Sequence, residues 1–261
     1  MLAHAREGAG RPLLLLHGTP SSARAWDPLM PQLARHFDVV RPDFPGFGQS
    51  PPLRDRPPTP QAFADEVEGV LDALGWHNAK IAGHSMGGWV ALELAKRGRA
   101  SAVVALAPAG LWRHESPRLT DLRLNVGLQL GKRFRRPAQR LLRYRLSRAI
   151  ALRDASARPG DVPAELALSA ARDTAEAVGW PAHFRAARTL RFQGGQDISV
   201  PVTVAFGDRE RIAIRKKSQH ADELPRHTRW VSLPSCGHMV QWDAPDEALA
   251  LISGKAAAAP S

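Results

Sequence analysis

A serine flanked by glycines lies in the middle of residues 80–97, KIAGHSMGGWVALELAKR, and this feature constrains the fold more than any other. The segment begins with a short apolar run, passes through a glycine-rich turn and continues with helical periodicity up to Gly98. The pattern predicts a strand, a sharp turn and a helix, with Ser85 at the apex of the turn. Because Gly83 and Gly87 carry no Cβ, they leave room for a crowded backbone that holds the serine oxygen clear of the sheet.

Apolar runs of strand length alternate with helical segments over the first 107 residues. A run that is apolar throughout suits the middle of a parallel sheet, where both faces are covered. The alternation therefore predicts an α/β fold in which a mostly parallel central sheet is flanked by helices. Besides the strand that opens residues 80–97, strands are expected at residues 11–16, 37–40, 102–107, 200–206 and 229–233.

The alternation stops between residues 111 and 191, a segment that is rich in arginine and interrupted by five prolines. It resumes at residues 200–206. We therefore expect a core formed by residues 1–110 and 192–261, with residues 111–191 inserted as a helical cap. Such a cap is expected to select the substrate and to contribute none of the reacting side chains.

Charge and composition limit the classes of partner. The formal net charge is +11, and residues 111–160 hold thirteen basic residues against three acidic ones. That segment lacks the interleaved aromatic residues of a nucleic-acid site, so a solvated helical face is favoured and no nucleic-acid partner is expected. No run of about 18 apolar residues predicts a membrane span. The absence of a signal pattern and the single cysteine, Cys236, predict a cytoplasmic protein without an internal disulfide.

A base and an acid that serve Ser85 are expected at the carboxyl edge of the same sheet. His238 follows the last predicted strand, and histidine is the side chain suited to take a serine proton near neutral pH. Asp208 follows the strand at 200–206 and is the preferred carboxylate, with Glu210, two residues further on, as the competitor. The chain order Ser85, Asp208, His238 is the order expected of this architecture. The backbone amides of Thr19 and Met86 are expected to stabilise an oxyanion.

Five motifs occur in this order along the chain: His17-Gly18-Thr19-Pro20, residues 43–50 (DFPGFGQS), residues 83–88 (GHSMGG), Gly207-Asp208 and Gly237-His238. Together they resemble the motifs of α/β-hydrolases with a helical cap. By this resemblance His17, Asp43 and His84 shape loops, and Pro20 follows a cis peptide bond. Epoxide hydrolases and haloalkane dehalogenases share the His-Gly-x-Pro loop but carry aspartate at the elbow, so Ser85 argues against both.

The expected function is hydrolysis of a carboxylic ester or related acyl bond of a small, mostly apolar molecule, with no cofactor and no metal. Trp89, Trp112 and Trp180 are candidates to line the substrate pocket. Two enzymatic alternatives use the same three side chains: a carbon–carbon bond hydrolase and a cofactor-free perhydrolase. The alternative from another class is a ligand-binding or signalling protein that keeps the fold with little turnover.

Overall fold

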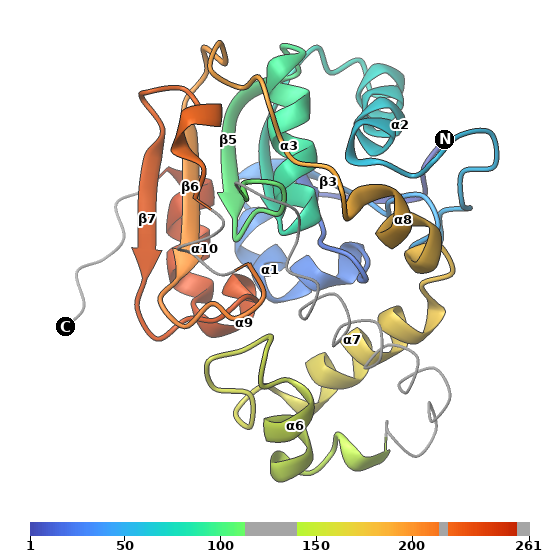
Figure 1. Cartoon of the computed structure of the whole chain (residues 1–261), viewed down its shortest axis with the longest axis vertical. Helices are drawn as coiled ribbons and strands as arrows, with labels where there is room; N and C mark the ends of the chain where they lie inside the picture. Colours follow the sequence, from blue (N-terminus) through green and yellow to red (C-terminus); the bar gives the residue numbers. More distant parts are fainter. Residues whose placement is uncertain (113–139, 214–218, 255–261) are drawn as a thin grey trace.

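The computed structural model describes residues 1–112, 140–213 and 219–254, and these residues build one central sheet covered by helices on both faces (Figure 1). The sheet has the strand order β1-β3-β2-β4-β5-β6-β7, and every neighbouring pair is parallel except β1 and β3. The predicted α/β fold with a mostly parallel sheet is confirmed. The strands are β1 (His4–Glu7), β2 (Arg11–Leu16), β3 (Phe37–Pro42), β4 (Ala79–His84), β5 (Ala100–Leu106), β6 (Val202–Gly207) and β7 (Arg229–Leu233).

The leucine run of β2 shows why these strands are apolar throughout. Leu14 and Leu16 pack into one apolar cluster, whereas Leu13 and Leu15 pack into another on the opposite face of the sheet. Both faces are dry because helices cover each of them. The helices are η1 (Ala23–Leu29), α1 (Met30–Leu33), α2 (Pro60–Ala73), α3 (Met86–Lys96), α6 (Arg145–Ala151), α7 (Ala164–Glu176), α8 (Trp180–Ala187), η2 (Ala221–Glu223), α9 (Val240–Asp243) and α10 (Pro245–Ser253).

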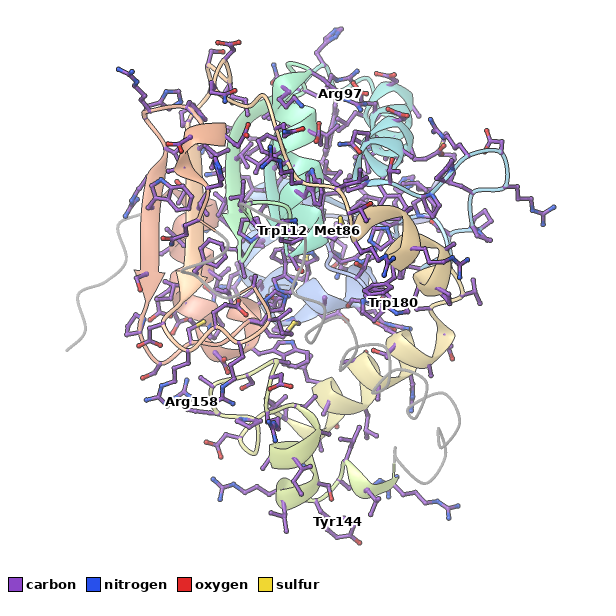
Figure 2. The ribbon with its side chains drawn as sticks, in the orientation of Figure 1. Met86, Arg97, Trp112, Tyr144, Arg158 and Trp180 are labelled. Carbon is purple, nitrogen blue, oxygen red and sulfur yellow. The ribbon has the colours of Figure 1, made fainter. Side chains whose placement is uncertain are left out.

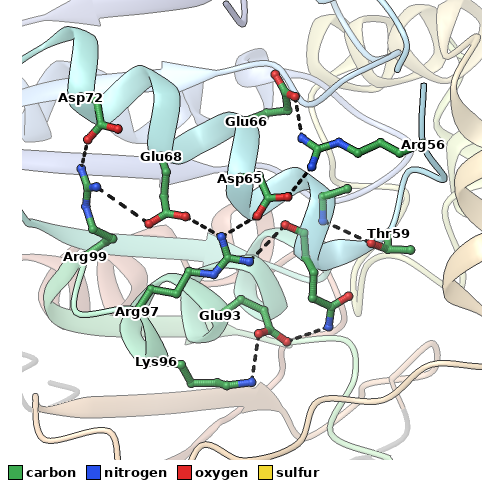
Figure 3. A network of polar contacts seen from close by, with 12 residues as sticks. Arg56, Thr59, Asp65, Glu66, Glu68, Asp72, Glu93, Lys96, Arg97 and Arg99 are labelled. Atoms are coloured by element: carbon green, nitrogen blue, oxygen red, sulfur yellow. Dashed lines mark hydrogen bonds and ion pairs between the residues drawn. The ribbon is translucent and has the colours of Figure 1, made fainter. Parts of the chain in front are cut away.

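Helices α2 and α3 lie side by side on one face of the sheet. Helix α2 begins at a cap in which Thr59 Oγ1 accepts a hydrogen bond from the amide of Ala62 at 3.1 Å. On the outer side, Arg97 pairs with Asp65 and Glu68 of α2 (Figure 3). These ion pairs are partly exposed, so they orient the two helices and add little stability beyond the apolar contact.

Helices α6, α7 and α8 lie between β5 and β6 in the chain. Helices α6 and α7 extend below the edge to which the arrowheads of β5, β6 and β7 point, whereas α8 lies higher, beside the core (Figure 1). They belong to the insertion expected at residues 111–191, of which residues 113–139 lie outside the described residues. Helix α8 contacts the core closely: Gly179 N donates to Gly46 O at 2.8 Å. No helix in the described ranges is long and apolar enough to cross a membrane.

Candidate active site

Ser85 occupies the sharp turn between β4 and α3, with backbone angles φ 52° and ψ −114°. This conformation is unfavourable for a residue with a Cβ, so the surroundings must hold it in place. The amide of Ser85 donates to Leu106 O at 2.9 Å, and its carbonyl accepts from Gly88, Trp89 and Ala109. The turn is therefore fixed from the end of β5 as well as from its own helix.

The two flanking glycines permit this turn because backbone lies where their side chains would be. A Cβ at Gly83 would lie 2.1 Å from Gly87 O, and one at Gly87 would lie 2.1 Å from Leu16 O. A Cβ at Gly18 would come within 3.1 Å of Ser85 Cβ. The turn after β2 is thus pressed directly against the serine.

His238 lies on the loop after β7 and points its ring at Glu210. The distance from His238 Nδ1 to Glu210 Oε2 is 2.8 Å, and both side chains are almost completely buried. Since a carboxylate only accepts, Nδ1 carries the proton, and Nε2 of the neutral ring is free to accept one. Within the described residues no hydrogen bond joins Ser85 Oγ to His238.

Glu210 is held as a carboxylate by its neighbours. Burial is the largest influence and favours its protonated form, but His238 and two backbone amides act against it. The amides of Ile212 and Ala213 add hydrogen bonds to Oε1 at 2.7 and 3.0 Å. Together they bring the pKa of Glu210 below its usual value.

The preference for Asp208 over Glu210 as the partner of His238 is not supported by this geometry. Asp208 is exposed, and its Oδ1 accepts from the amide of Cys236 at 3.2 Å. The reason is the tight contact between the two loops: a Cβ at Gly207 would lie 2.0 Å from Cys236 O. This contact turns the Asp208 side chain outward, and the longer side chain of Glu210 reaches the imidazole instead.

The amides of Thr19 and Met86 lie at equivalent places just beyond the ends of the neighbouring strands β2 and β4. Leu16 of β2 is in register with Gly83 of β4. Thr19 comes three residues after Leu16, and Met86 comes three residues after Gly83. Among the described residues neither amide donates to a protein acceptor. The peptide bond between Thr19 and Pro20 is cis.

His17 and His84 are buried and act on the backbone. His17 Nε2 accepts from the amide of Phe44 at 2.9 Å, and His84 Nε2 donates to the carbonyl of His238 at 2.9 Å. The His84 and His238 rings lie 4.8 Å apart, so the histidine loop sits beside the serine turn. Burial, aided by the charge of His238, lowers the pKa of His84 to about 3, and burial also lowers that of His17. Both rings are therefore neutral near pH 7.

Asp43 ties two loops at the same edge of the sheet. Its carboxylate accepts from the amides of Ala23 at 2.8 Å and Gln49 at 2.9 Å. Ala23 follows β2 and Gln49 follows β3, so one side chain holds both loops beside the serine turn.

The three tryptophans predicted to line a substrate pocket take different positions. Trp89 is 0 % exposed and donates its Nε1–H to Glu93, so it is a core residue. Trp112 is half-buried and packs edge-on against Trp89. Trp180 is buried on α8, well apart from Trp112 (Figure 2). Contact of Trp112 or Trp180 with substrate stays a prediction.

Asp243, for which the sequence suggested no role, joins the insertion to the histidine loop. Its Oδ2 accepts from the amides of Gly237 and Ala157, each at 2.8 Å, and its Oδ1 from Ser156 Oγ at 2.6 Å. The amide of Met239 donates to Ala155 O at 2.8 Å. Residues 155–157 therefore brace the loop that carries His238. The only sequence signal was an acidic residue just before the Ala-Pro that starts α10.

Cys236 is buried, and its thiol is not a metal ligand among the described residues. Burial, with nearby carboxylates, raises the pKa of the Cys236 thiol to about 12, which suits a packing residue. No group of three or more histidine, cysteine, aspartate or glutamate side chains in the described ranges is arranged to hold a metal ion.

Comparisons with known proteins identify the family of the chain. A sequence model of the alpha/beta hydrolase fold matches residues 11–245. The chain is 36% identical over 199 residues to epoxide hydrolase EphH of Mycobacterium tuberculosis, a match covering 73% of this chain and 92% of that protein. It is 38% identical over 109 residues to a 2-hydroxymuconate semialdehyde hydrolase of a Pseudomonas species, covering 40% of this chain and 38% of the relative.

Among solved structures, a hydrolase from Pseudomonas aeruginosa superposes with a TM-score of 0.73 at 25% sequence identity. The superposition covers 97% of this chain and 93% of the other.

Proposed function

Since the chain belongs to the α/β-hydrolase family, we propose that it is a serine hydrolase that cleaves a carboxylic ester or related acyl bond. The observation that carries this proposal is the buried His238–Glu210 pair beside a strained serine turn. The substrate is a small, mostly apolar molecule, and no cofactor takes part.

In the first half of the reaction, Ser85 Oγ attacks the carbonyl carbon while His238 Nε2 takes the hydroxyl proton. Glu210 remains ionised and stabilises the imidazolium through Nδ1–H. The carbonyl oxygen becomes an oxyanion that accepts from the amides of Thr19 and Met86. The tetrahedral intermediate then collapses, the C–O bond breaks, and His238 returns the proton to the leaving alcohol.

In the second half, a water molecule attacks the acyl-enzyme. His238 takes a proton from the water, the same two amides receive the oxyanion, and the carboxylic acid leaves as the proton returns to Ser85. The neutral state of His84 suits this cycle, because a second cation beside His238 would oppose formation of the imidazolium.

The chemistry of the nucleophile decides between this activity and that of the epoxide hydrolase relative. A carboxylate nucleophile opening an epoxide forms an ester, which water can cleave. A serine oxygen would form an ether, which has no carbonyl for water to attack. Ser85 at the elbow therefore favours acyl substrates although the chain is 36% identical to EphH.

A second candidate is hydrolysis of a carbon–carbon bond next to a carbonyl. The observation that favours it is the similarity to the 2-hydroxymuconate semialdehyde hydrolase. Perhydrolysis, in which hydrogen peroxide replaces water in the second half, uses the same residues and remains a third candidate.

The test combines a covalent probe with a substrate panel. A fluorophosphonate should label the native protein and leave Ser85→Ala unlabelled. Activated esters of graded acyl length should be hydrolysed faster than a ring-fission dienone or a simple epoxide. Equal labelling of both proteins would overturn the assignment of Ser85 as the nucleophile. Turnover of the dienone alone would mean that the substrate is cleaved at a carbon–carbon bond and not at an ester.

A further inference from the structure

A group of large apolar side chains is exposed on and just before α6, at the far tip of the insertion. Tyr144 is 67 % exposed and marks the end of the molecule most distant from α2 (Figure 2). Together with Met1 and Val178, its group accounts for every exposed large hydrophobic residue in the described ranges. The group, here called the α6 surface, is Leu141, Tyr144, Leu146 and Ile150. Exposed apolar residues gathered on one element, rather than scattered, indicate an interaction site.

The chain around the α6 surface is also strongly basic. Residues 140–161 contain six arginines against only two carboxylates, Asp154 and Asp161. Arg140 and Arg143 are exposed, and neither pairs with a carboxylate among the described residues. Arg145 pairs with Asp161 at 2.7 Å and is still 77 % exposed. A positive field therefore surrounds the apolar side chains.

A hollow opens beside these side chains. Its volume is about 440 Å³, and it is lined by Arg145 and Arg158, by Leu146 and Ala149, by residues 159–160, and by the Asp161 carboxylate that pairs with Arg145. Guanidinium groups next to an apolar wall fit a molecule that carries an anionic head on an apolar body.

These features select the class of partner. A second copy of this chain would bring the same positive charges together and is disfavoured. A free anion would satisfy the arginines and leave the apolar side chains in water. Nucleic acid would do the same, because three of the four apolar side chains are aliphatic and cannot stack on bases. An anionic bilayer offers negative headgroups and an apolar interior a few ångströms deeper.

We propose that the α6 surface binds the headgroup region of an anionic lipid bilayer, with the arginines on the phosphates and the apolar side chains inserted between the headgroups. The α6 surface lies on the side of the molecule to which the strands β5, β6 and β7 point, which is the side of Ser85 (Figure 1). Binding through it places the insertion at the membrane with the serine turn behind it. The protein then draws its substrate from the lipid phase rather than from bulk water.

Sedimentation of the full-length protein with vesicles tests this proposal. Vesicles of phosphatidylcholine with about one third phosphatidylglycerol should bind the protein, whereas pure phosphatidylcholine should not. Arg140→Gln/Arg143→Gln should weaken binding roughly 25-fold, at roughly fivefold per removed charge. Leu146→Ser/Ile150→Ser should weaken it roughly tenfold or more, because the inserted apolar area is lost.

Matched controls separate this surface from the general positive charge. Arg226→Gln/Arg229→Gln removes two exposed arginines at the opposite end of the molecule, and Val178→Ser removes an apolar residue that is 69 % exposed. Both should bind vesicles as the native protein does. Ser85→Ala should also bind normally, which separates this proposal from the catalytic one.

Equal loss in the arginine controls, or equal binding to both vesicle types, would overturn the α6 surface as the site. The proposal would also be overturned if duplex DNA displaced the protein from anionic vesicles at a lower concentration than soluble phosphatidylglycerol does.

Discussion

At the residue scale, the arrangement around His238 depends on a choice between two acids that follow the same strand. Glu210 contacts Nδ1 at 2.8 Å, and its side chain is only 1 % exposed. Asp208 accepts one amide on the exposed side of the loop. A buried carboxylate can hold the tautomer of a histidine, whereas one that faces solvent elsewhere cannot.

The two isosteric amide substitutions should therefore differ sharply. Glu210→Gln should lower kcat on an activated ester by about ten-thousand-fold, because the imidazole loses its partner and takes the wrong tautomer. Asp208→Asn should stay within about threefold of the native kcat, since Asp208 only orients a loop amide. Steady-state kinetics on both variants, with circular dichroism to verify folding, make the comparison. The reverse ranking of the two variants would mean that Asp208, and not Glu210, is the carboxylate that serves His238.

At the element scale, close contacts among the described residues hold the insertion against the core. Asp173 of α7 is buried and accepts from Ser22 Oγ at 2.5 Å and from Arg24. On α8, His183 donates to Pro58 O at 2.8 Å and stacks on Phe63. These contacts reach the loop after β2 and the segment before α2. The position of the insertion is therefore coupled to the turn that carries Thr19.

A pair of identical glycine substitutions tests this contact. A Cβ at Gly179 would lie 2.9 Å from Gly46 Cα, so Gly179→Ala should lower the free energy of unfolding by about 1–3 kcal/mol and loosen α8. Gly69, inside α2, has no atom within 4 Å of its would-be Cβ, so Gly69→Ala should raise the free energy of unfolding by about 0.5–1 kcal/mol. Urea denaturation measures both. A neutral Gly179→Ala would mean that α8 does not depend on this close approach.

At the scale of the whole molecule, the layers around the sheet enclose neutral histidines. His84 lies between the serine turn and the histidine loop. His183 of α8 packs against Phe47 and Phe63. Burial is the largest cause that lowers the pKa of His84 to about 3 and of His183 to about 4. Both are protonated far more readily in the unfolded chain, where the pKa is about 6.5.

Stability should therefore fall as the pH decreases. Above about pH 6.5 both histidines are neutral in the native and in the unfolded chain, so they leave the free energy of unfolding unchanged. Below this pH the unfolded chain binds protons that the native protein does not, so the free energy of unfolding falls. The loss for His183 extends down to pH about 4, with a slope of up to about 1.4 kcal/mol per pH unit. Urea denaturation at several pH values measures this dependence. In His183→Phe, the slope of the free energy of unfolding against pH should be smaller than in the native protein by up to the equivalent of one proton. An unchanged slope in His183→Phe would show that burial does not lower the pKa of His183 in the native protein.

The sequence by itself determined the features that are encoded locally. An apolar run, a glycine on either side of Ser85 and a helical period are all contained in residues 80–97, so the elbow could be predicted without knowledge of its neighbours. The parallel sheet followed in the same way, because the run Leu13–Leu16 has apolar side chains for both of its faces. The place of His238 followed from the rule that parallel strands end at one edge.

Only the tertiary structure decided which acid meets His238, how the insertion is anchored and where its exposed residues gather. Asp208 and Glu210 are two residues apart, and their directions depend on how the loop packs against Cys236. The partners of Asp173 and Asp243 lie far away in the chain, so no local pattern reveals them. In the sequence, the α6 surface belongs to an arginine-rich segment, for which a solvated helical face was the favoured interpretation. Its four exposed apolar side chains became visible only once folding had left them without a core to enter, because burial is a property of the whole chain.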